Sequence, residues 1–256
     1  SAGWNEGSVL TADLTEQTLS MDVVDNGKVA SRSPLGELMT SGERGDQAVA
    51  AINSAFFDIN FSDAPVYSSV SNGESVVGSD SHRPAFTIVG GKAVVQALTT
   101  SGKATLGDGS AIDLATLNDP SLPEGKVGVY NSRWGSYTLD RPIGGPDKVS
   151  AHAAYALVQD GKVVKASGIV EKGVGEQEIP EGAQLLLGRE EGADKVAALK
   201  VGDKVDVAIG PDQDVDMGVQ GSDQILTNGE VMAMNDDSLV KTSHPRTAIG
   251  VSKDGS

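Results

Sequence analysis

The chain has 256 residues, no cysteine and a net charge of −16, from 36 acidic and 20 basic residues. The lack of cysteine excludes disulfide bonds, thiolate chemistry and cysteine-ligated zinc, and the acidic balance disfavours nucleic acid and anionic membrane surfaces as partners, because both attract basic proteins. No apolar run approaches the ~20 residues of a membrane-spanning helix, so we expect no membrane insertion.

Turn dipeptides recur between short apolar runs, and the chain contains 32 glycines. Such dipeptides tolerate the positive φ angles that two-residue hairpin turns require. The sequence therefore predicts an α+β fold, with mainly antiparallel β-sheets and a few short helices. The six predicted turns are Asn72-Gly73, Gly90-Gly91, Asp108-Gly109, Asp160-Gly161, Asn228-Gly229 and Asp254-Gly255.

Two stretches carry helix signals. "SPLGELMTSG" has Ser33 before a proline at a first-turn position and a glycine just past its end. "REEGADKVAALKVGD" begins at Arg189 and has acidic residues in its first turn. In the second stretch we expect Val196, Leu199 and Val201 to face a core.

We expect one domain over residues 1–256, in which about 100–210 form a smaller inserted lobe. The segment from Thr99 to Pro146 is rich in Gly, Pro, Asp and Asn, which predicts irregular structure or the start of that lobe. "RTAIGVSKDGS" predicts a C-terminal strand followed by a turn, and that strand would lack a partner. We therefore expect the native product to continue, so that a C-terminal continuation completes the domain; a frayed tail is the alternative.

The stretch "AINSAFFDIN" places two of the four phenylalanines between Asn53 and Asp58. "AVAAIN" predicts a buried strand, with the aromatic pair at its end, where site residues often lie. In an extended chain Asn53 and Phe57 would face one side, and Phe56 and Asp58 the other. The alternative is that both phenylalanines belong to the core and Asp58 starts a turn.

"TSHPRTAIG" is the second candidate site. Arg246 is a fixed cation suited to bidentate binding of phosphate or carboxylate, with Thr247 next to it. His244 titrates near neutral pH and is a candidate acid or base. The alternative is that Arg246 pairs with a surface carboxylate.

The other two histidines are weaker candidates for a functional site. His82 and Arg83 precede an apolar run, where a solvated strand entry is the simpler interpretation. His152 is expected within or beside a strand, without a catalytic role.

Asp212, Asp214 and Asp216 alternate along the chain like the first oxygen ligands of a calcium loop. The glycine comes one place late, the twelfth position is Asp223 rather than glutamate, and no helices are predicted on either side. We therefore expect a polar loop and no cofactor, with calcium at these three aspartates as the alternative. Motifs of nucleotide-dependent transfer, zinc proteolysis and α/β-hydrolases are also absent.

Five blocks in a fixed order resemble the phosphodiester glycosidase family, whose members cleave a sugar from a phosphodiester. The first block contains the Phe-Phe-Asp stretch, and the last contains the Arg-Thr stretch. The blocks are "AVAAINSAFFDINFSDAPVYSSVSNGE", "RPAFTIVGGKAVV", "IPEGAQLLLGREEGADKVAALKVGDKVDV", "ILTNGEV" and "HPRTAIGVSKDG".

The resemblance implies roles for the candidate residues. Asn53 would hydrogen-bond sugar or phosphate, Phe57 would pack at the pocket, and Asp58 would hold the loop or act on a proton. Arg246 would bind the phosphodiester anion, with Thr247 beside it.

The implied activity is hydrolysis of a glycosyl-1-phosphodiester to free sugar and a phosphate monoester, through an oxocarbenium-like transition state. Its catalytic carboxylate would be Asp58 first and Glu74 second. We expect a bacterial enzyme that is secreted or at the cell surface and acts on a glycosyl phosphate or cell-envelope glycan.

Two departures from the family pattern keep alternatives open. Ser54 stands where the family has glycine, and the family's C-terminal Gly-rich block is missing. The alternatives are a non-catalytic glycan-binding or structural module of the same fold, and a phosphodiesterase that releases sugar-1-phosphate.

Overall fold

The structure is a computed structural model that describes residues 6–16, 18–41, 48–54, 56–233 and 242–253. Strands dominate it and helices are few, which confirms the predicted mainly antiparallel α+β class. The strands are β1 (Ser69–Ser71), β2 (Glu74–Ser79), β3 (Arg83–Val89), β4 (Lys92–Leu98), β5 (Thr100–Leu106), β6 (Ala111–Leu114), β7 (Thr116–Leu117), β8 (Val127–Asn131), β9 (Ala153–Gln159), β10 (Lys162–Ala166), β11 (Gln184–Arg189), β12 (Val205–Pro211), β13 (Met217–Gln220), β14 (Leu226–Thr227) and β15 (Glu230–Val231). The helices are α1 (Leu35–Ser41), α2 (Glu191–Ala197) and the 3-10 turn η2 (Ser132–Trp134).

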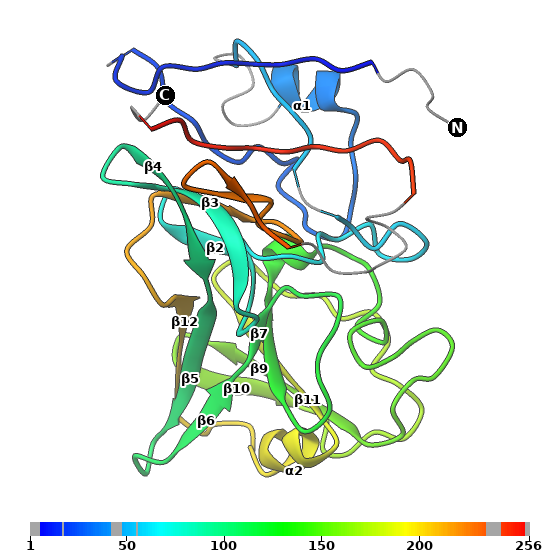
Figure 1. The fold of residues 1–256 in the computed structure, drawn as a ribbon. Coiled ribbons are helices and arrows are strands. Elements are labelled where there is room, and N and C mark those ends of the chain that lie inside the picture. The colour runs from blue at the N-terminus through cyan, green and yellow to red at the C-terminus, as the bar shows by residue number, and fades with distance from the viewer. Residues whose placement is uncertain (1–5, 17, 42–47, 55, 234–241, 254–256) are drawn as a thin grey trace.

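The largest sheet has ten strands in the order β10-β9-β11-β8-β7-β2-β1-β13-β3-β4. Among the described residues all of its ladders are antiparallel except that of β7 with β8. A three-stranded sheet, β12-β5-β6, contacts the larger sheet at β2, β7, β8 and β10 (Figure 1). The segment from Thr99 to Pro146 contains β5 to β8 up to Asn131, so the prediction of irregular structure is wrong there. Residues 135–146 form no strand or helix, as that prediction expected.

Five of the six predicted turns join neighbouring strands as hairpins: β1–β2, β3–β4, β5–β6, β9–β10 and β14–β15. Asn72 and Gly73 have φ angles of 52° and 77°, so both central residues are in the left-handed region that these turns require. The sixth dipeptide, Asp254-Gly255, lies outside the described residues.

Two apolar clusters lie on opposite faces of β8, β9 and β11. Side chains alternate along a strand, so Leu185 and Leu187 enter one cluster while Leu186 enters the other. The first cluster contains the fully buried Trp134 and is covered by loops. The second lies between the ten-stranded and three-stranded sheets. The loops over the first cluster carry the charged groups described below.

Both predicted helices are present. Val196 and Leu199 are buried, as expected, whereas Val201 is 67% exposed, so its prediction is wrong. The helix ends at Ala197 and the chain turns outward at residues 201–202, which removes Val201 from the apolar face. In the described part of the chain, no helix has the length and apolar character needed to cross a membrane.

The second residues of the two helices make a matched pair for a stability test. A Cβ at Gly192 in α2 would stand 2.1 Å from the Lys126 carbonyl oxygen, whereas one at Gly36 in α1 would meet nothing within 4 Å. We expect Gly192→Ala to lower the free energy of unfolding by about 1–3 kcal/mol through this overlap. Gly36→Ala should be neutral or stabilising by about 0.5–1 kcal/mol. Urea unfolding measures both, and equal effects would contradict the packing of α2.

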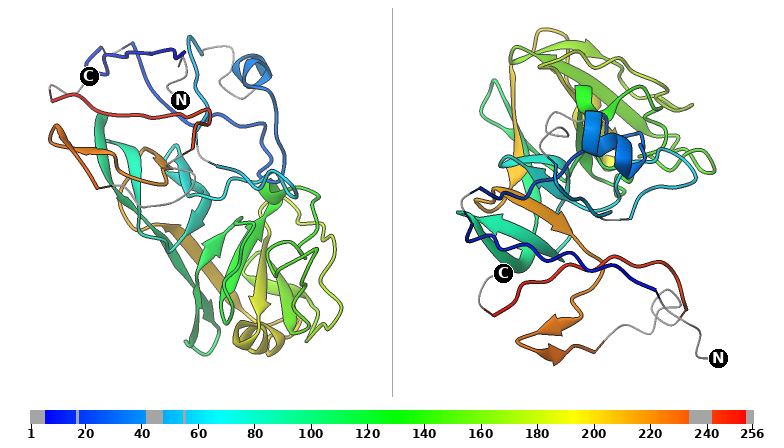
Figure 2. Two further views of the ribbon diagram at one scale, coloured as in Figure 1. Left: turned by 45° about the vertical axis from the view of Figure 1, so that its right-hand side comes forward. Right: turned by 90° about the horizontal axis from the view of Figure 1, so that it is seen from above.

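Two predicted strands are absent. Residues 48–54 form no strand, and Val49 and Ile52 are 83% and 46% exposed. Residues 246–251 also form no strand, and only Val251 packs onto a core cluster, where it joins Met21 and Val23. Apolar composition misled both predictions, because neither segment has a strand beside it to complete a ladder. The first and last described segments, residues 6–16 and 242–253, lie on the same side of the molecule (Figures 1 and 2).

Candidate functional site

Residues 57–65, here the Asp58 loop, follow the predicted aromatic pair. A bridge between Phe57 and Pro65 closes the loop. The Asp58 amide donates to the Ala64 carbonyl at 2.9 Å, while the Asp58 carbonyl accepts from the amides of Phe61 and Asp63, each at 3.1 Å. Asp58 is thus the residue around which the loop turns.

The Asp58 carboxylate is 8% exposed and fully hydrogen-bonded. Oδ2 accepts from the amide and hydroxyl of Ser62, at 3.1 and 2.7 Å, and from Nε of Arg141 at 2.7 Å. Oδ1 accepts from Nη2 of Arg141 at 2.8 Å. Burial alone would raise the pKa of Asp58, but the hydrogen bonds from Arg141 and Ser62 outweigh it and lower the pKa below its usual value. This arrangement suits a carboxylate that holds the loop.

Arg141 belongs to residues 139–146, here the Arg141 loop. Its Nη1 donates to the Gly145 carbonyl at 3.0 Å, and its guanidinium lies 4.4 Å from the ring centroid of Phe61. The hydrogen bond to Asp58 raises the pKa of Arg141, so the pair is ionised at neutral pH. Sequence analysis missed Arg141, and its only signal was a lone cation in the Gly- and Pro-rich stretch "LDRPIGGP".

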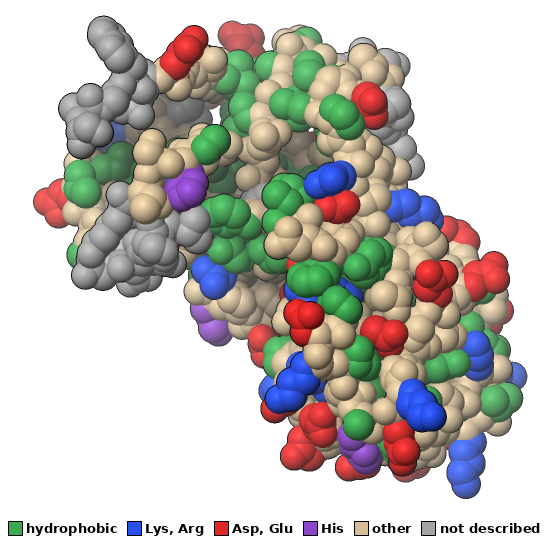
Figure 3. Space-filling view, turned by 90° about the vertical axis from the view of Figure 1, so that its right-hand side faces the viewer, with side chains coloured by type: hydrophobic (Ala, Val, Ile, Leu, Met, Phe, Trp, Pro, Cys, Tyr) green, Lys and Arg blue, Asp and Glu red, His purple; other side chains and the backbone are tan. Residues whose placement is uncertain are grey.

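The two phenylalanines before Asp58 are exposed. Phe56 is 47% exposed and Phe57 is 40% exposed, so the alternative in which both belong to the core is wrong. The loops at the right of Figure 1 face the viewer in Figure 3, where hydrophobic side chains gather around a hollow and Lys, Arg, Asp and Glu are interspersed below it. The Asp58 loop therefore presents aromatic surface next to an ion pair.

The structure does not bring the other predicted site residues to Asp58. Asn53 is exposed, and Glu74 is exposed at the start of β2. His244, Arg246 and Thr247 are also exposed, and Nη2 of Arg246 donates to the Thr242 carbonyl at 3.1 Å. None of the hydrogen bonds to the Asp58 carboxylate comes from these residues.

Ser54 stands where the resemblance expects glycine. Its φ is not in the left-handed region, so the backbone adopts no conformation there that only glycine favours. The substitution therefore causes no backbone strain in this chain.

Asp119 is a second buried carboxyl, located just after β7. It is 7% exposed, and its Oδ1 accepts from the Ser121 amide at 2.8 Å. Burial raises the pKa of Asp119 to about 7, and the charge of Asp80 adds to the shift. Sequence analysis missed this residue because "NDPS" has the composition of an exposed turn.

The loops of the two carboxyls meet. The Leu122 amide, three residues after Asp119, donates to the Pro142 carbonyl, next to Arg141, at 2.9 Å. Asp58 is therefore held ionised, whereas Asp119, on the adjoining loop, has a pKa of about 7. The structure thus places two carboxyls with oppositely shifted pKa values on adjoining loops.

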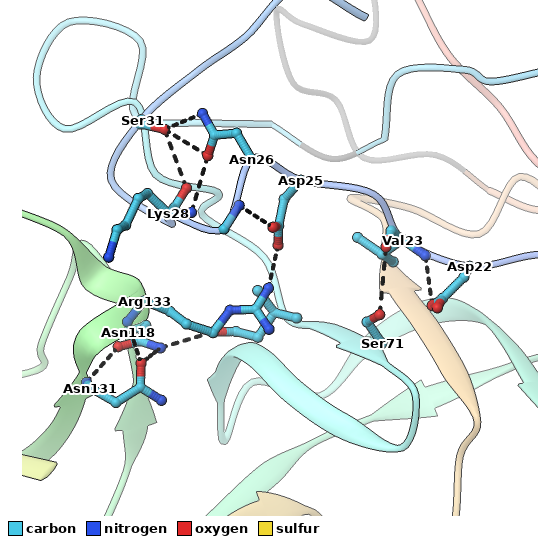
Figure 4. Close-up of polar contacts among 12 residues, drawn as sticks. Asp22, Val23, Asp25, Asn26, Lys28, Ser31, Ser71, Asn118, Asn131 and Arg133 are labelled. Carbon is cyan, nitrogen blue, oxygen red and sulfur yellow. Dashed lines mark hydrogen bonds and ion pairs between the residues drawn. The ribbon is translucent and has the colours of Figure 1, made fainter. Parts of the chain in front are cut away.

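A polar network surrounds the ends of β7 and β8 (Figure 4). Nδ2 of Asn118, at the end of β7, donates to Oδ1 of Asn131 at 3.0 Å. Arg133 in η2 pairs with Asp25, with Nη2 and Oδ2 2.5 Å apart. Lys28 donates from Nζ to the Ser132 carbonyl at 2.9 Å. These contacts attach the N-terminal segment, residues 22–31, across this end of the sheet.

Two of the three alternating aspartates, Asp212 and Asp216, accept hydrogen bonds from protein groups. Asp212 accepts from the hydroxyls of Thr99 and Ser101, at 2.6 and 2.5 Å, and Asp216 accepts from the Gly91 amide at 3.3 Å. Across the described ranges no group of three or more His, Cys, Asp or Glu is placed to hold a metal ion. Calcium binding stays an untested alternative.

His152 lies just before β9, and its Nε2 is 2.8 Å from Oδ1 of Asp194 in α2. The prediction that it lies beside a strand is confirmed. The pair links the start of β9 to α2.

Comparisons with known proteins show the fold and no family. No family model matches the chain, and no curated protein matches it either. A hypothetical protein from Synechocystis has a similar structure, with a TM-score of 0.73 and 20% identity over 91% of this chain and 43% of that one. A presumed exported protein from Burkholderia pseudomallei K96243 has a TM-score of 0.55 and 18% identity over 81% of this chain and 46% of that one. The chain thus spans less than half the length of each of these structures.

Proposed function

We propose that the protein is a phosphodiester-glycosidase-like hydrolase that cleaves a glycosyl-1-phosphodiester into free sugar and a phosphate monoester. The observation that carries the proposal is the buried Asp58–Arg141 pair, which fixes the Asp58 loop while Phe57 stays 40% exposed. Exposed aromatic rings on a rigid loop suit the apolar face of a sugar. The type of reaction is taken from the resemblance of the five sequence blocks, in their order, to the phosphodiester glycosidase family.

The chemistry divides the work between two carboxyls. Cleavage develops positive charge on the sugar and needs a water to be deprotonated, while the phosphate monoester leaves readily. In this proposal Asp58 stays anionic and positions the loop. Asp119 lies on a loop that is hydrogen-bonded to the Arg141 loop through the Leu122 amide and the Pro142 carbonyl, and its pKa is raised to about 7. We propose that it moves the proton, because a pKa near the working pH suits general acid–base catalysis. This revises the initial choice of Asp58 and Glu74 for that role.

Arg246 keeps its proposed role as the cation that neutralises the leaving phosphate. Thr247, His244 and Asn53 would contact the substrate beside it. These residues lie on exposed segments, so the proposal requires those segments to close over the Asp58 loop when substrate binds. A further segment of a longer protein would complete the site, which agrees with the greater length of both structural neighbours.

We also propose that the protein is secreted or at the cell surface and acts on an envelope glycan. The description of the Burkholderia neighbour as an exported protein supports this location. The acidic surface, with a net charge of −16, disfavours a nucleic-acid role.

A non-catalytic glycan-binding module is the second candidate function. One observation favours it: both oxygens of Asp58 are hydrogen-bonded, and the lowered pKa makes this carboxylate a weak base. In that case the loop would present aromatic surface to a glycan without turning it over.

The two candidates separate in an assay of turnover. The purified protein is incubated with a panel of sugar-1-phosphodiesters, and reducing sugar, phosphate monoester and sugar-1-phosphate are quantified. We expect reducing sugar, and a fall of about 10²-fold in Arg246→Ala, which is typical of losing one charge-stabilising donor. Sugar-1-phosphate would indicate a phosphodiesterase, while glycan binding without any product would favour the binding module. Unchanged turnover in the variant would remove Arg246 from the site.

A further inference from the structure

Arg83, at the start of β3, has no carboxylate partner among the residues that the structure describes. Its guanidinium carbon lies 4.7 Å from the ring centroid of Tyr67, and its Nη1 donates to the Ser222 carbonyl at a long 3.5 Å. Among the described residues no Asp or Glu forms an ion pair with it. The chain has 36 acidic and 20 basic residues, so carboxylates are plentiful. An arginine that pairs with none of the described carboxylates is available to bind an anionic ligand.

Phe56 extends this pair into a cluster. Its ring meets the ring of Tyr67 edge-on, with centroids 5.9 Å apart and planes at 80°. The Val66 amide donates to the Phe56 carbonyl at 3.0 Å, which keeps the two aromatic residues adjacent. Phe56 is 47% exposed, so the cluster of Phe56, Tyr67 and Arg83 offers aromatic surface beside a cation.

A second arginine–aromatic pair, Arg141 on Phe61, shows what distinguishes Arg83. Arg141 directs Nε and Nη2 to Asp58 and Nη1 to Gly145, so its donors are engaged within the protein. Arg83 also uses its flat face against a ring, but stacking leaves the in-plane N–H groups for hydrogen bonds. Within the described ranges, only the long hydrogen bond to the Ser222 carbonyl uses these N–H groups.

We propose that Phe56, Tyr67 and Arg83 form a binding subsite for a phosphorylated sugar. The sugar ring packs on Phe56 and Tyr67, and the phosphate accepts from the planar N–H groups of Arg83. This inference rests on the proposed function for its choice of phosphate and deepens that function by adding a contact outside the Asp58–Arg141 pair. Because Phe56 and Phe57 are consecutive, the subsite would hold a neighbouring phosphorylated unit of a glycan chain.

Direct binding tests the subsite without any need for turnover. Isothermal titration calorimetry would use α-D-glucose 1-phosphate, methyl α-D-glucopyranoside and inorganic phosphate as probes of the purified protein. We expect glucose 1-phosphate to bind most tightly, and its dissociation constant to rise at least about tenfold in Arg83→Gln and in Phe56→Ala. Arg83→Lys should also weaken binding, since lysine keeps the charge but loses the planar fork.

Controls come from the far end of the molecule. Lys200→Gln and Val201→Ala remove an exposed cation and an exposed apolar side chain just after α2, and both should leave affinity unchanged. Circular dichroism of each variant checks that it is folded.

Several results would overturn the subsite: no binding of any probe, affinity unchanged in Arg83→Gln, or affinity for glucose 1-phosphate no higher than for inorganic phosphate. Its failure is distinguishable from failure of the hydrolase proposal. Arg83-dependent binding without cleavage of any phosphodiester keeps the subsite and removes the hydrolase. Cleavage without Arg83-dependent binding does the reverse.

Discussion

Asp119→Asn should remove a loss of stability that the wild-type protein shows as pH rises from about 4 to about 7. Asp119 is buried, no described cation pairs with it, and its pKa in the folded protein is raised to about 7 from an ordinary 3.8. Between these values the folded state binds the proton and the unfolded state does not. The contribution of Asp119 to the free energy of unfolding therefore falls as pH rises across this window. Below and above the window this contribution does not change with pH.

The loss of unfolding free energy caused by Asp119 has an upper limit. A difference of this size in pKa corresponds to about 4 kcal/mol at most. Urea unfolding at pH 5, 6, 7 and 8 gives the free energy of unfolding for both proteins. The difference between wild type and Asp119→Asn should change steadily up to pH 7, whereas Asp206→Asn, an exposed carboxyl on β12, should track the wild type. Parallel curves for Asp119→Asn and wild type would show that this carboxyl titrates normally.

Arg141→Ala should cost about 2–3 kcal/mol of unfolding free energy at pH 7. The change leaves the buried Asp58 carboxylate without its two charged hydrogen bonds, and uncompensated buried charges are expensive. The Asp58 loop should also loosen, which faster amide hydrogen exchange at Ser62 and Asp63 would report.

Arg32→Ala is the matched control for that prediction. Arg32 pairs with Asp63 of the same loop at 3.4 Å, but its side chain is 64% exposed. Exposed pairs contribute about 0–1 kcal/mol, so this variant should be nearly as stable as the wild type. Similar losses in the two variants would mean that Asp58 does not depend on Arg141.

Local chemistry made much of the fold predictable. The hairpin turns at Asn72-Gly73 and Asp160-Gly161 follow from backbone conformations that few residue pairs tolerate. Helix α2 follows from its acidic first turn and from the spacing of Val196 and Leu199. These features depend on residues close in sequence.

Features that depend on distant partners were not predictable. Residues 48–54 have the composition of a strand, but a strand forms only where another lies beside it. Asp58 was identified from the sequence, yet its partner Arg141 lies 83 residues away. Asp119 has the local sequence of a surface turn, yet it is buried, and its carbonyl accepts from the hydroxyl of the distant, fully buried Tyr130 at 2.8 Å.

The candidate site shows the same division. The exposed Phe57 and the carboxylate of Asp58 could be selected by residue type alone, whereas their roles could not. Four hydrogen bonds hold the Asp58 carboxylate in place, and burial raises the pKa of Asp119 to about 7.

The measurement that tests the central claim most directly is hydrolysis of a sugar-1-phosphodiester in ¹⁸O-labelled water, followed by mass spectrometry of the products. A glycosidase breaks the bond between the sugar carbon and oxygen, so the account predicts that the label enters the sugar and is absent from the phosphate monoester. Label in the phosphate would mean that the bond to phosphorus breaks, which would contradict the account.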